Sequence, residues 1–262
     1  MSLLLLSYSN LNRYPEIIRH FSSTREGGVS SGEYASLNLG NYSDDRTDNI
    51  RRNKELLCNE LNIPVTRLVG AHQVHGTSVK LVDENLVSSS TTDRTSAMEG
   101  YDALICRTPG ICITATTADC VPVLLFDPVT KSIAAIHSGW RSTLNNITNT
   151  TIEAMQKAFG TDPAHLIAAI GPCISGTAYE VGEELQLQFE TKDAGTDRFF
   201  IPIDNGKYLF DIRSVVRCQL QKAGVSDIEI SEHCTFSEPE LFFSARRQSI
   251  HSGRMLSGIQ LL

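Results

Sequence analysis

The 262-residue chain has no long hydrophobic run. Residues 3–6 are four leucines without a basic stretch before them, and the longest later run, residues 121–126, has the length of a strand. Both runs are too short for a signal peptide or a membrane span. We therefore expect a cytoplasmic protein that has no membrane partner.

Positive charge is also scarce. The chain carries 23 lysines and arginines against 30 aspartates and glutamates, which gives a formal net charge of -7. This balance excludes a nucleic-acid backbone as the main partner, and an anionic small-molecule substrate would have to be bound by local arginines. No internal repeat and no long linker divides the chain, so we expect one domain over residues 1–262 and leave the oligomeric state open.

The chain also lacks any C-x-x-C pair, although it has seven cysteines. This excludes a ribbon-type zinc site and a thioredoxin motif. In a reducing compartment we expect most of these thiols to be free and buried. Cys120 is the exception, because of the residues that surround it.

The hydrophobic periodicity predicts an α+β sandwich with mixed sheets. Helices are expected at residues 45–61, 143–159 and 211–223. Strands are expected at 68–69, 79–82, 103–105, 111–115, 121–126, 132–136, 167–170 and 228–230. The polar stretches 88–96 and 195–205 indicate exposed loops, of which the first could be a lid.

Three short pieces offer metal ligands or nucleophiles: HQVHG at 72–76, ADC at 118–120 and HSGWR at 137–141. The strands 121–126 and 132–136 are predicted to form a hairpin, which places Cys120 and His137 at the same open end. His72 follows its own strand and could reach that end as well. The sequence therefore predicts a His72, Cys120 and His137 set.

Zinc suits these donors, since imidazole and thiolate fit a borderline-soft ion and three protein ligands leave one position for water. Copper accepts the same donors and is the alternative. His75 could be a fourth ligand, which would make the site structural. Because His72 and His75 would need a helix to converge, we assign His75 to the substrate or to proton transfer instead.

A second enzyme class needs no metal. Cys120 and His137 could form a thiolate–imidazole pair, with Asp119 orienting the base. Asp119 is equally compatible with a turn or capping role.

Three arginines are candidates for binding an anion. Arg25 stands where an expected strand meets a glycine turn, Arg141 directly follows the His137 piece, and Arg246 follows an apolar run. Their guanidinium groups match phosphate oxygens well.

With these residues in view, the chain resembles the YfiH/YlmD-type family, which is variously described as polyphenol oxidase (laccase), peptidoglycan editing factor and purine nucleoside phosphorylase. The similarity runs through most of the chain in order. The matching pieces are FSSTREGGVS (21–30), LNLG (37–40), QVHG (73–76), TADCVPVLL (117–125), HSGWR (137–141), GPCI (171–174), YEVG (179–182) and FFSARR (242–247).

The resemblance implies an α-β-β-α sandwich of the cysteine-hydrolase type seen in CNF toxins, with zinc at His72, Cys120 and His137. It adds Asn38, in the second piece, to the residues that bind substrate. The implied activity is phosphorolysis of adenosine, inosine or methylthioadenosine to a free base and a sugar 1-phosphate, together with hydrolytic deamination of adenosine. The alternatives are a copper-dependent polyphenol oxidase and an editing factor for cell-wall precursors.

Overall fold

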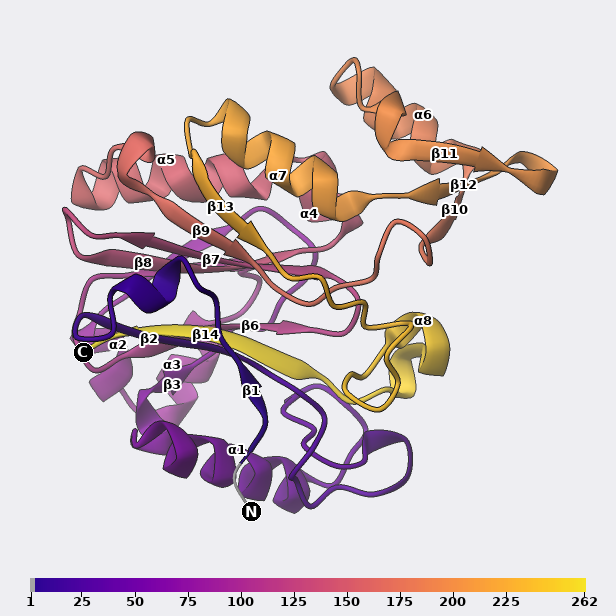
Figure 1. The fold of residues 1–262 in the computed structure, drawn as a ribbon. Helices are drawn as coiled ribbons and strands as arrows, with labels where there is room; N and C mark the ends of the chain where they lie inside the picture. The colour runs from indigo at the N-terminus through magenta and orange to yellow at the C-terminus, as the bar shows by residue number, and fades with distance from the viewer. Residues whose placement is uncertain (1–2) are drawn as a thin grey trace.

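The computed structural model describes residues 3–262 and stacks two sheets between layers of helix. Figure 1 shows helices above one sheet and α1 below the other, which confirms the expected α-β-β-α sandwich. The six-stranded sheet runs in the order β13 (Asp227–Ile230), β9 (Ile167–Ile170), β7 (Val121–Asp127), β8 (Ser132–Ser138), β5 (Ala103–Cys106), β4 (Val79–Val82). The five-stranded sheet runs β1 (Leu5–Leu6), β2 (Ile18–Ser23), β14 (Met255–Leu261), β6 (Cys112–Thr117), β3 (Leu68–Val69).

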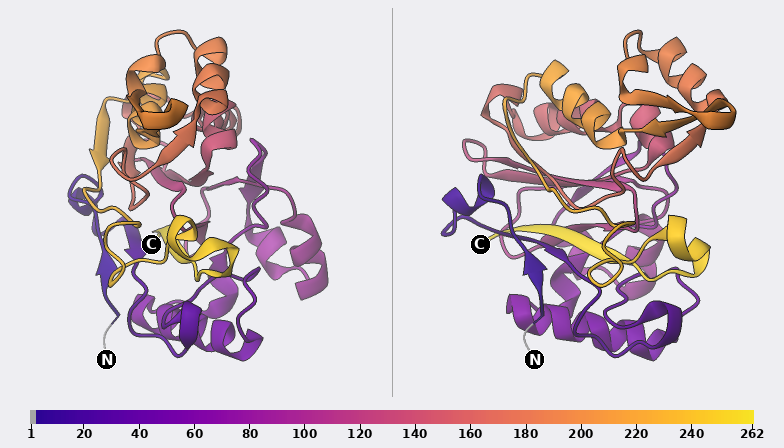
Figure 2. Two further views of the ribbon diagram at one scale, coloured as in Figure 1. Left: turned by 90° about the vertical axis from the view of Figure 1, so that its right-hand side faces the viewer. Right: turned by 45° about the vertical axis from the view of Figure 1, so that its right-hand side comes forward.

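A small third sheet stands out from this sandwich beside α6, as Figure 1 and the right-hand view of Figure 2 show. Its order is β10 (Glu180–Gly182), β12 (Lys207–Phe210), β11 (Phe200–Ile203). The α-helices are α1 (Thr47–Leu61), α2 (Glu84–Ser88), α3 (Thr91–Ala97), α4 (Trp140–Leu144), α5 (Ile147–Phe159), α6 (Glu183–Lys192), α7 (Ile212–Lys222) and α8 (Ala245–Gln248). Short 3-10 turns are η1 (Leu11–Arg13), η2 (Gly32–Tyr34), η3 (Val65–Arg67), η4 (Pro163–His165), η5 (Asp197–Phe199), η6 (Asp204–Gly206) and η7 (Ser249–His251). Within residues 3–262, every helix is too short or too polar to traverse a lipid bilayer.

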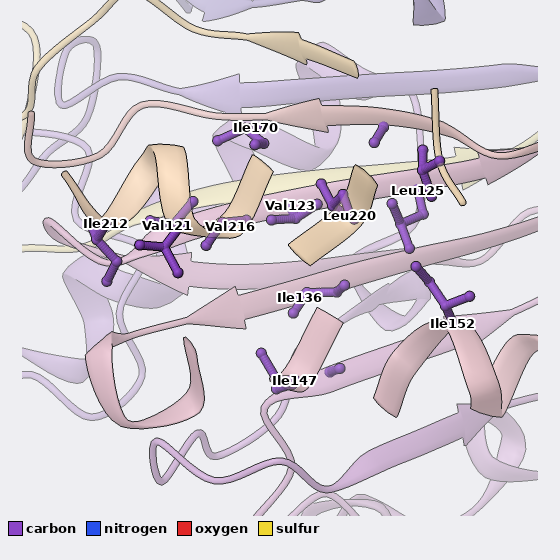
Figure 3. Close-up of a cluster of buried hydrophobic side chains, with 14 of the residues drawn as sticks. Val121, Val123, Leu125, Ile136, Ile147, Ile152, Ile170, Ile212, Val216 and Leu220 are labelled. Carbon is purple, nitrogen blue, oxygen red and sulfur yellow. The ribbon is translucent and has the colours of Figure 1, made fainter. Parts of the chain in front are cut away.

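Strand β7 lies at the centre of the molecule and is buried along its whole length. Its alternate side chains point to opposite faces of the sheet. Val121, Val123 and Leu125 join the core under α5 and α7, which Figure 3 shows in close-up. Leu124 and Phe126 join the core between the two sheets. Apolar residues on both faces explain why this strand has no polar alternation in the sequence.

The predicted hairpin is confirmed. Strands β7 and β8 pair antiparallel, with Val121 opposite Ser138 and Pro122 opposite His137. The connecting turn is closed by Asp127, whose carboxylate accepts hydrogen bonds from the Val129 amide and the Thr130 hydroxyl. The register places Cys120 and the end of β8 at the same edge of the sheet.

Two of the expected helices form nearly as predicted. The helix expected at 45–61 is α1, and the helix expected at 211–223 is α7, whose first turn is capped by the Asp211 side chain on the Ser214 amide. The helix expected at 143–159 is instead divided into α4 and α5. Asn146 has a left-handed backbone, with φ of 57°, which ends one helix and starts the next.

The two expected loops contain regular structure. Most of 88–96 belongs to α3, whose first turn is capped by the Ser90 side chain, so its polar residues lie on an exposed helix. Most of 195–205 forms η5 and β11, which pairs with β12. The local polarity of these segments correctly indicated that they are exposed, but it did not indicate their backbone conformation.

Candidate functional site

Three side chains that could share a metal ion meet at one edge of the six-stranded sheet: His75, Cys120 and His137. Their ligand atoms all lie within 4.8 Å of one another. Cys120 immediately precedes β7, and His137 lies near the end of β8, so the hairpin brings these two together. His75 comes from the loop after β3. We call these three residues the donor trio.

The geometry of the donor trio fits a metal ion with an open position. The Cys120 Sγ lies 3.8 Å from His75 Nε2. Zinc at its usual bond lengths would hold a sulfur and a nitrogen roughly 3.5 Å apart in a tetrahedral site, so this pair needs only a small contraction. Two imidazoles and a thiolate suit zinc or copper. The donor set therefore fits a catalytic metal, without deciding which one.

The structure corrects the predicted set, because His75 and not His72 stands beside Cys120 and His137. The backbone of His72 forms an isolated parallel β-bridge with Glu99, and the His72 Nδ1 lies 2.6 Å from the Glu99 carboxylate. The ring of His72 also packs against the Tyr42 ring, with centroids 4.0 Å apart. These partners hold His72 away from the donor trio but on the same cavity.

A turned loop, and no helix, brings His75 to the site. His75 has φ of 61°, a left-handed conformation that is uncommon outside glycine. The preceding Gln73 ties the loop to β6, since its side-chain amide donates to the Thr116 carbonyl at 2.7 Å and accepts from the Thr116 amide at 2.8 Å. The prediction assumed that two histidines three residues apart could converge only on a helix, and it did not consider this turn.

Asp102 organises the site, although it is not among the residues predicted from the sequence. Its carboxylate accepts hydrogen bonds from three successive amides, those of Val74, His75 and Gly76, at 2.7 to 3.1 Å. The same carboxylate lies 2.7 Å from His137 Nδ1. One buried aspartate thus positions two members of the donor trio. The available signal was a lone acidic residue directly before the apolar strand β5.

This arrangement leaves the Nε2 of His137 facing Cys120. Burial opposes ionisation of the Cys120 thiol, but the charge of His137 and hydrogen bonds from both histidines lower the pKa of Cys120 to about 6. Burial also disfavours a charged His137, but the Cys120 thiolate and Asp102 raise the pKa of His137 to about 9. Cys120 is therefore ready to act as a thiolate, the form that binds metals.

The metal-free alternative, a thiolate–imidazole pair of Cys120 and His137, required Asp119 to orient His137, and Asp119 does not do so. Its carboxylate turns to the opposite side and accepts hydrogen bonds from the Thr235 and Ser244 hydroxyls and from the Arg246 amide. The backbone of Asp119 has φ of 86°. Asp119 instead ties the start of β7 to the C-terminal segments and so fixes the adjacent Cys120.

The residues predicted to bind substrate or phosphate have other partners. The Arg25 guanidinium donates to the carbonyls of Ala35 and Pro239 and lies over the Phe243 ring. Asn38 is fully buried, and its side chain bonds Ser43, Asp45 and the amides of Gly40 and Arg254. Both side chains brace loops.

Arg141 and Arg246 are likewise directed elsewhere. The Arg141 guanidinium lies 4.1 Å from the Trp140 ring centroid. Arg246 donates to the Glu180 carbonyl at 2.8 Å and lies over Tyr179. Neither side chain lines the cavity described below, and their expected contact with an anion stays a prediction.

A cavity of about 560 Å³ opens beside the donor trio. All three members line it, as do His72 and Tyr42. Its other walls come from the loop after η2, from α1, η3, β3 and the loop after it, from α3 and β6, and from the C-terminal segment. The remaining lining residues are Leu39, Gly40, Asn41, Lys54, Val65, Leu68, Gly70, Ala71, Gln73, Arg94, Thr95, Met98, Thr114, Thr116, Thr117, Ala118, Ala245, Arg254 and Leu256. The volume is typical of a site for a small organic ligand.

The fold and the site define a class: an α-β-β-α sandwich with a thiolate and two imidazoles in the wall of a ligand-sized cavity. Comparison with known proteins identifies the family. Residues 19–262 match the family described as multi-copper polyphenol oxidoreductase laccase. The crystal structure of the hypothetical protein YfiH from Bacillus licheniformis superposes with a TM-score of 0.91 at 28% identity, covering 100% of this chain and 97% of that one.

Named relatives agree with this assignment. A purine nucleoside phosphorylase from Bacteroides thetaiotaomicron is 41% identical over 260 residues, which are 98% of this chain and 96% of the relative. Adenosine deaminase RL5, from an unknown prokaryotic organism, is 35% identical over 249 residues, 93% of this chain and 94% of the relative. The chain belongs to the YfiH/YlmD-type, laccase-like family.

Proposed function

We propose that this chain is a zinc-dependent purine nucleoside enzyme. It would cleave adenosine, inosine or methylthioadenosine with phosphate, giving the base and a sugar 1-phosphate, and would deaminate adenosine with water. The observation that carries the proposal is the donor trio, whose ligand atoms lie within 4.8 Å of one another on a cavity of about 560 Å³. The names of the relatives supply the substrate class.

In this proposal His75, Cys120 and His137 hold the metal. Zinc bound there would supply a water of lowered pKa and a positive charge next to the substrate. Asp102 fixes the tautomer of His137 by accepting a hydrogen bond from its Nδ1–H group, and it also fixes the loop that carries His75.

The predicted roles of the two histidines are reversed in this proposal: His75 binds the metal, and His72 transfers the proton. Glu99 accepts from His72 Nδ1, which leaves Nε2 as the ring nitrogen available to a ligand in the cavity. A histidine oriented by a carboxylate is a common general acid–base arrangement. The leaving base or the exocyclic amine would receive its proton from this residue.

Adenosine turnover by the zinc-loaded protein, with and without phosphate, tests the function. Free adenine that forms only with phosphate shows phosphorolysis, and inosine that forms without phosphate shows deamination. Zinc-loaded protein that converts neither adenosine, inosine nor methylthioadenosine would overturn the proposal.

A copper-dependent polyphenol oxidase is the second candidate, and the description of the matching family favours it. The same two imidazoles and thiolate accept copper. Phenol oxidation that follows copper loading and not zinc loading would support this candidate, with nucleoside turnover measured on the same two preparations.

A further inference from the structure

The wall of the cavity includes positively charged side chains that have no role in the proposed function. Three cationic side chains line it, those of Lys54, Arg94 and Arg254, and among the described residues of its lining there is no aspartate or glutamate. The chain as a whole has a net charge of -7, so this lining differs from the overall charge balance. Cationic side chains in the wall of a cavity attract an anionic ligand.

Lys54 lies on the inward face of α1. It follows Ile50 by four residues and precedes Leu57 by three, and both of these are buried. The Nζ of Lys54 donates to the neutral side-chain carbonyl of Asn41. Burial first, and then the charge of Arg94, lower the pKa of Lys54 to about 8. This ammonium is thus partly desolvated and has a neutral partner.

The neighbouring cations of α1 differ from Lys54. Arg51 and Arg52 are exposed, and both donate to the Glu55 carboxylate, at 3.3 and 3.0 Å. An exposed arginine that has a carboxylate partner is the ordinary surface arrangement. Lys54 departs from it in both burial and partner.

Arg94 approaches the same part of the cavity from α3. It is half-buried on a helix whose other residues, except Ala97, are exposed, and its Nη1 donates to the Thr66 carbonyl at 2.7 Å. Burial lowers its pKa from the ordinary value. Two like charges that face one cavity repel each other, and a bound dianion would remove that cost.

We propose that Lys54 and Arg94 form a phosphate-binding subsite of this cavity. The subsite rests on the proposed function for its ligand class, a phosphate dianion, which is either inorganic phosphate or a phosphate ester on the nucleoside. Lysine supplies a point charge and arginine a planar fork, a pair well suited to phosphate oxygens.

The variants Lys54→Met and Arg94→Met test the subsite, because each removes the charge and leaves an unbranched apolar side chain, which is nearly as long as lysine and shorter than arginine. The first readout is the rise in the thermal unfolding midpoint of the zinc-loaded protein with inorganic phosphate and, separately, with adenosine 5'-monophosphate. The second is the phosphate KM for adenosine phosphorolysis. We expect each variant to weaken the binding of one of these two ligands at least tenfold.

Two controls isolate the charge. Arg52→Gln removes an exposed cation from the same helix and should behave as the wild type. Lys54→Arg keeps the charge and should retain most of the ligand-induced stabilisation, which separates loss of charge from a damaged α1. The thermal midpoints without ligand report on folding of every variant.

The outcomes separate the two possible sources of phosphate and the two proposals. Weakened inorganic phosphate binding marks a co-substrate site, and weakened binding of the monophosphate alone marks a site for a phosphorylated nucleoside. Unchanged affinity for both ligands in both variants, or no binding of either ligand by the wild type, overturns the subsite. A wild type that binds phosphate but turns over no nucleoside overturns only the proposed function.

Discussion

At the scale of single residues, Asp102 does the most to shape the site. It is 2% exposed, and its two carboxylate oxygens bond one ring nitrogen and three backbone amides. Hydrogen bonds and the charge of His137 keep the pKa of Asp102 below its usual value although burial opposes this. The carboxylate that orients a metal-binding histidine commonly decides affinity as well as geometry.

Replacing Asp102 with asparagine should lower zinc affinity about 10- to 100-fold, since the amide cannot accept as many hydrogen bonds and does not favour the same His137 tautomer. Competition with a chromogenic chelator measures this. Asp127→Asn is the matched control, because Asp127 is a fully buried aspartate at the far end of the same hairpin. Equal zinc affinity in wild type and D102N would contradict the assigned role.

The sequence was sufficient for part of the site. Cys120 and His137 were expected to meet because a hairpin cancels their separation along the chain, and β7 and β8 pair as expected. The choice between His72 and His75 depended on the left-handed turn at His75 and on the three amides bound by Asp102. These are contacts across 26 to 28 residues, which no local pattern reports.

At the scale of elements, the junction from β8 to α4 packs directly against the donor trio. A Cβ placed on Gly139 would lie 2.6 Å from His75 Cδ2 and 3.1 Å from Cys120 Sγ. Gly139 has an ordinary backbone conformation, so close approach, and not its φ angle, requires glycine.

Gly139→Ala should therefore displace His75 and lower zinc affinity by at least tenfold, with a loss of roughly 1–3 kcal/mol in folding free energy if the junction moves instead. Gly76→Ala is a suitable control, because its Cβ would make only ordinary contacts at 3.5 and 3.6 Å. Chelator competition and urea unfolding of both variants check this. Equal effects in the two variants would show that crowding at Gly139 is not the cause.

The elements that the sequence missed are those defined by their neighbours. Strand β14, which was not predicted, pairs with β2 and β6 and is buried throughout. The strand expected to end before Arg25 is β2, whose bounds were not predicted and which includes polar residues such as Arg19 and His20. Neither has a clear alternation. The single helix expected at 143–159 is interrupted because Asn146 has a left-handed backbone, a conformation that asparagine adopts more readily than most residues.

At the scale of the whole molecule, charge is distributed unevenly. The net charge of -7 correctly describes an acidic chain, yet its cavity is lined by cations from α1, α3 and the segment before β14. Lys54, Arg94 and Arg254 lie far apart in the sequence, and nothing in their local sequence distinguishes them from other lysines and arginines of the chain. Their convergence depends on the packing of the layers, which composition alone does not determine.

The contact between β2 and the N-terminal segment predicts a dependence of global stability on pH. His20 Nε2 accepts from the Tyr8 amide at 2.9 Å, and the ring stacks on Tyr8. Burial lowers the pKa of His20 from 6.5 to about 4, against the opposing effect of the nearby Glu229 carboxylate. The folded state therefore binds this proton less readily than the unfolded chain. Its contribution to stability is complete above pH 6.5 and is lost as the pH falls toward 4.

Between pH 7.5 and 5.0 the wild type should lose about 1–2 kcal/mol more folding free energy than His20→Gln, a figure reduced to allow for partial exposure of the ring. Urea unfolding of the two metal-free proteins at both pH values measures the difference. The other titrating groups are common to both proteins. Parallel pH profiles would contradict the lowered pKa of His20.

The central claim is that His75, Cys120 and His137, and not His72, hold the metal. Metal quantification on the wild type, His75→Ala and His72→Ala, each purified without added metal, tests it most directly. We predict about one ion per chain in the wild type and in H72A, and almost none in H75A. Metal retained by H75A and lost from H72A would contradict the account.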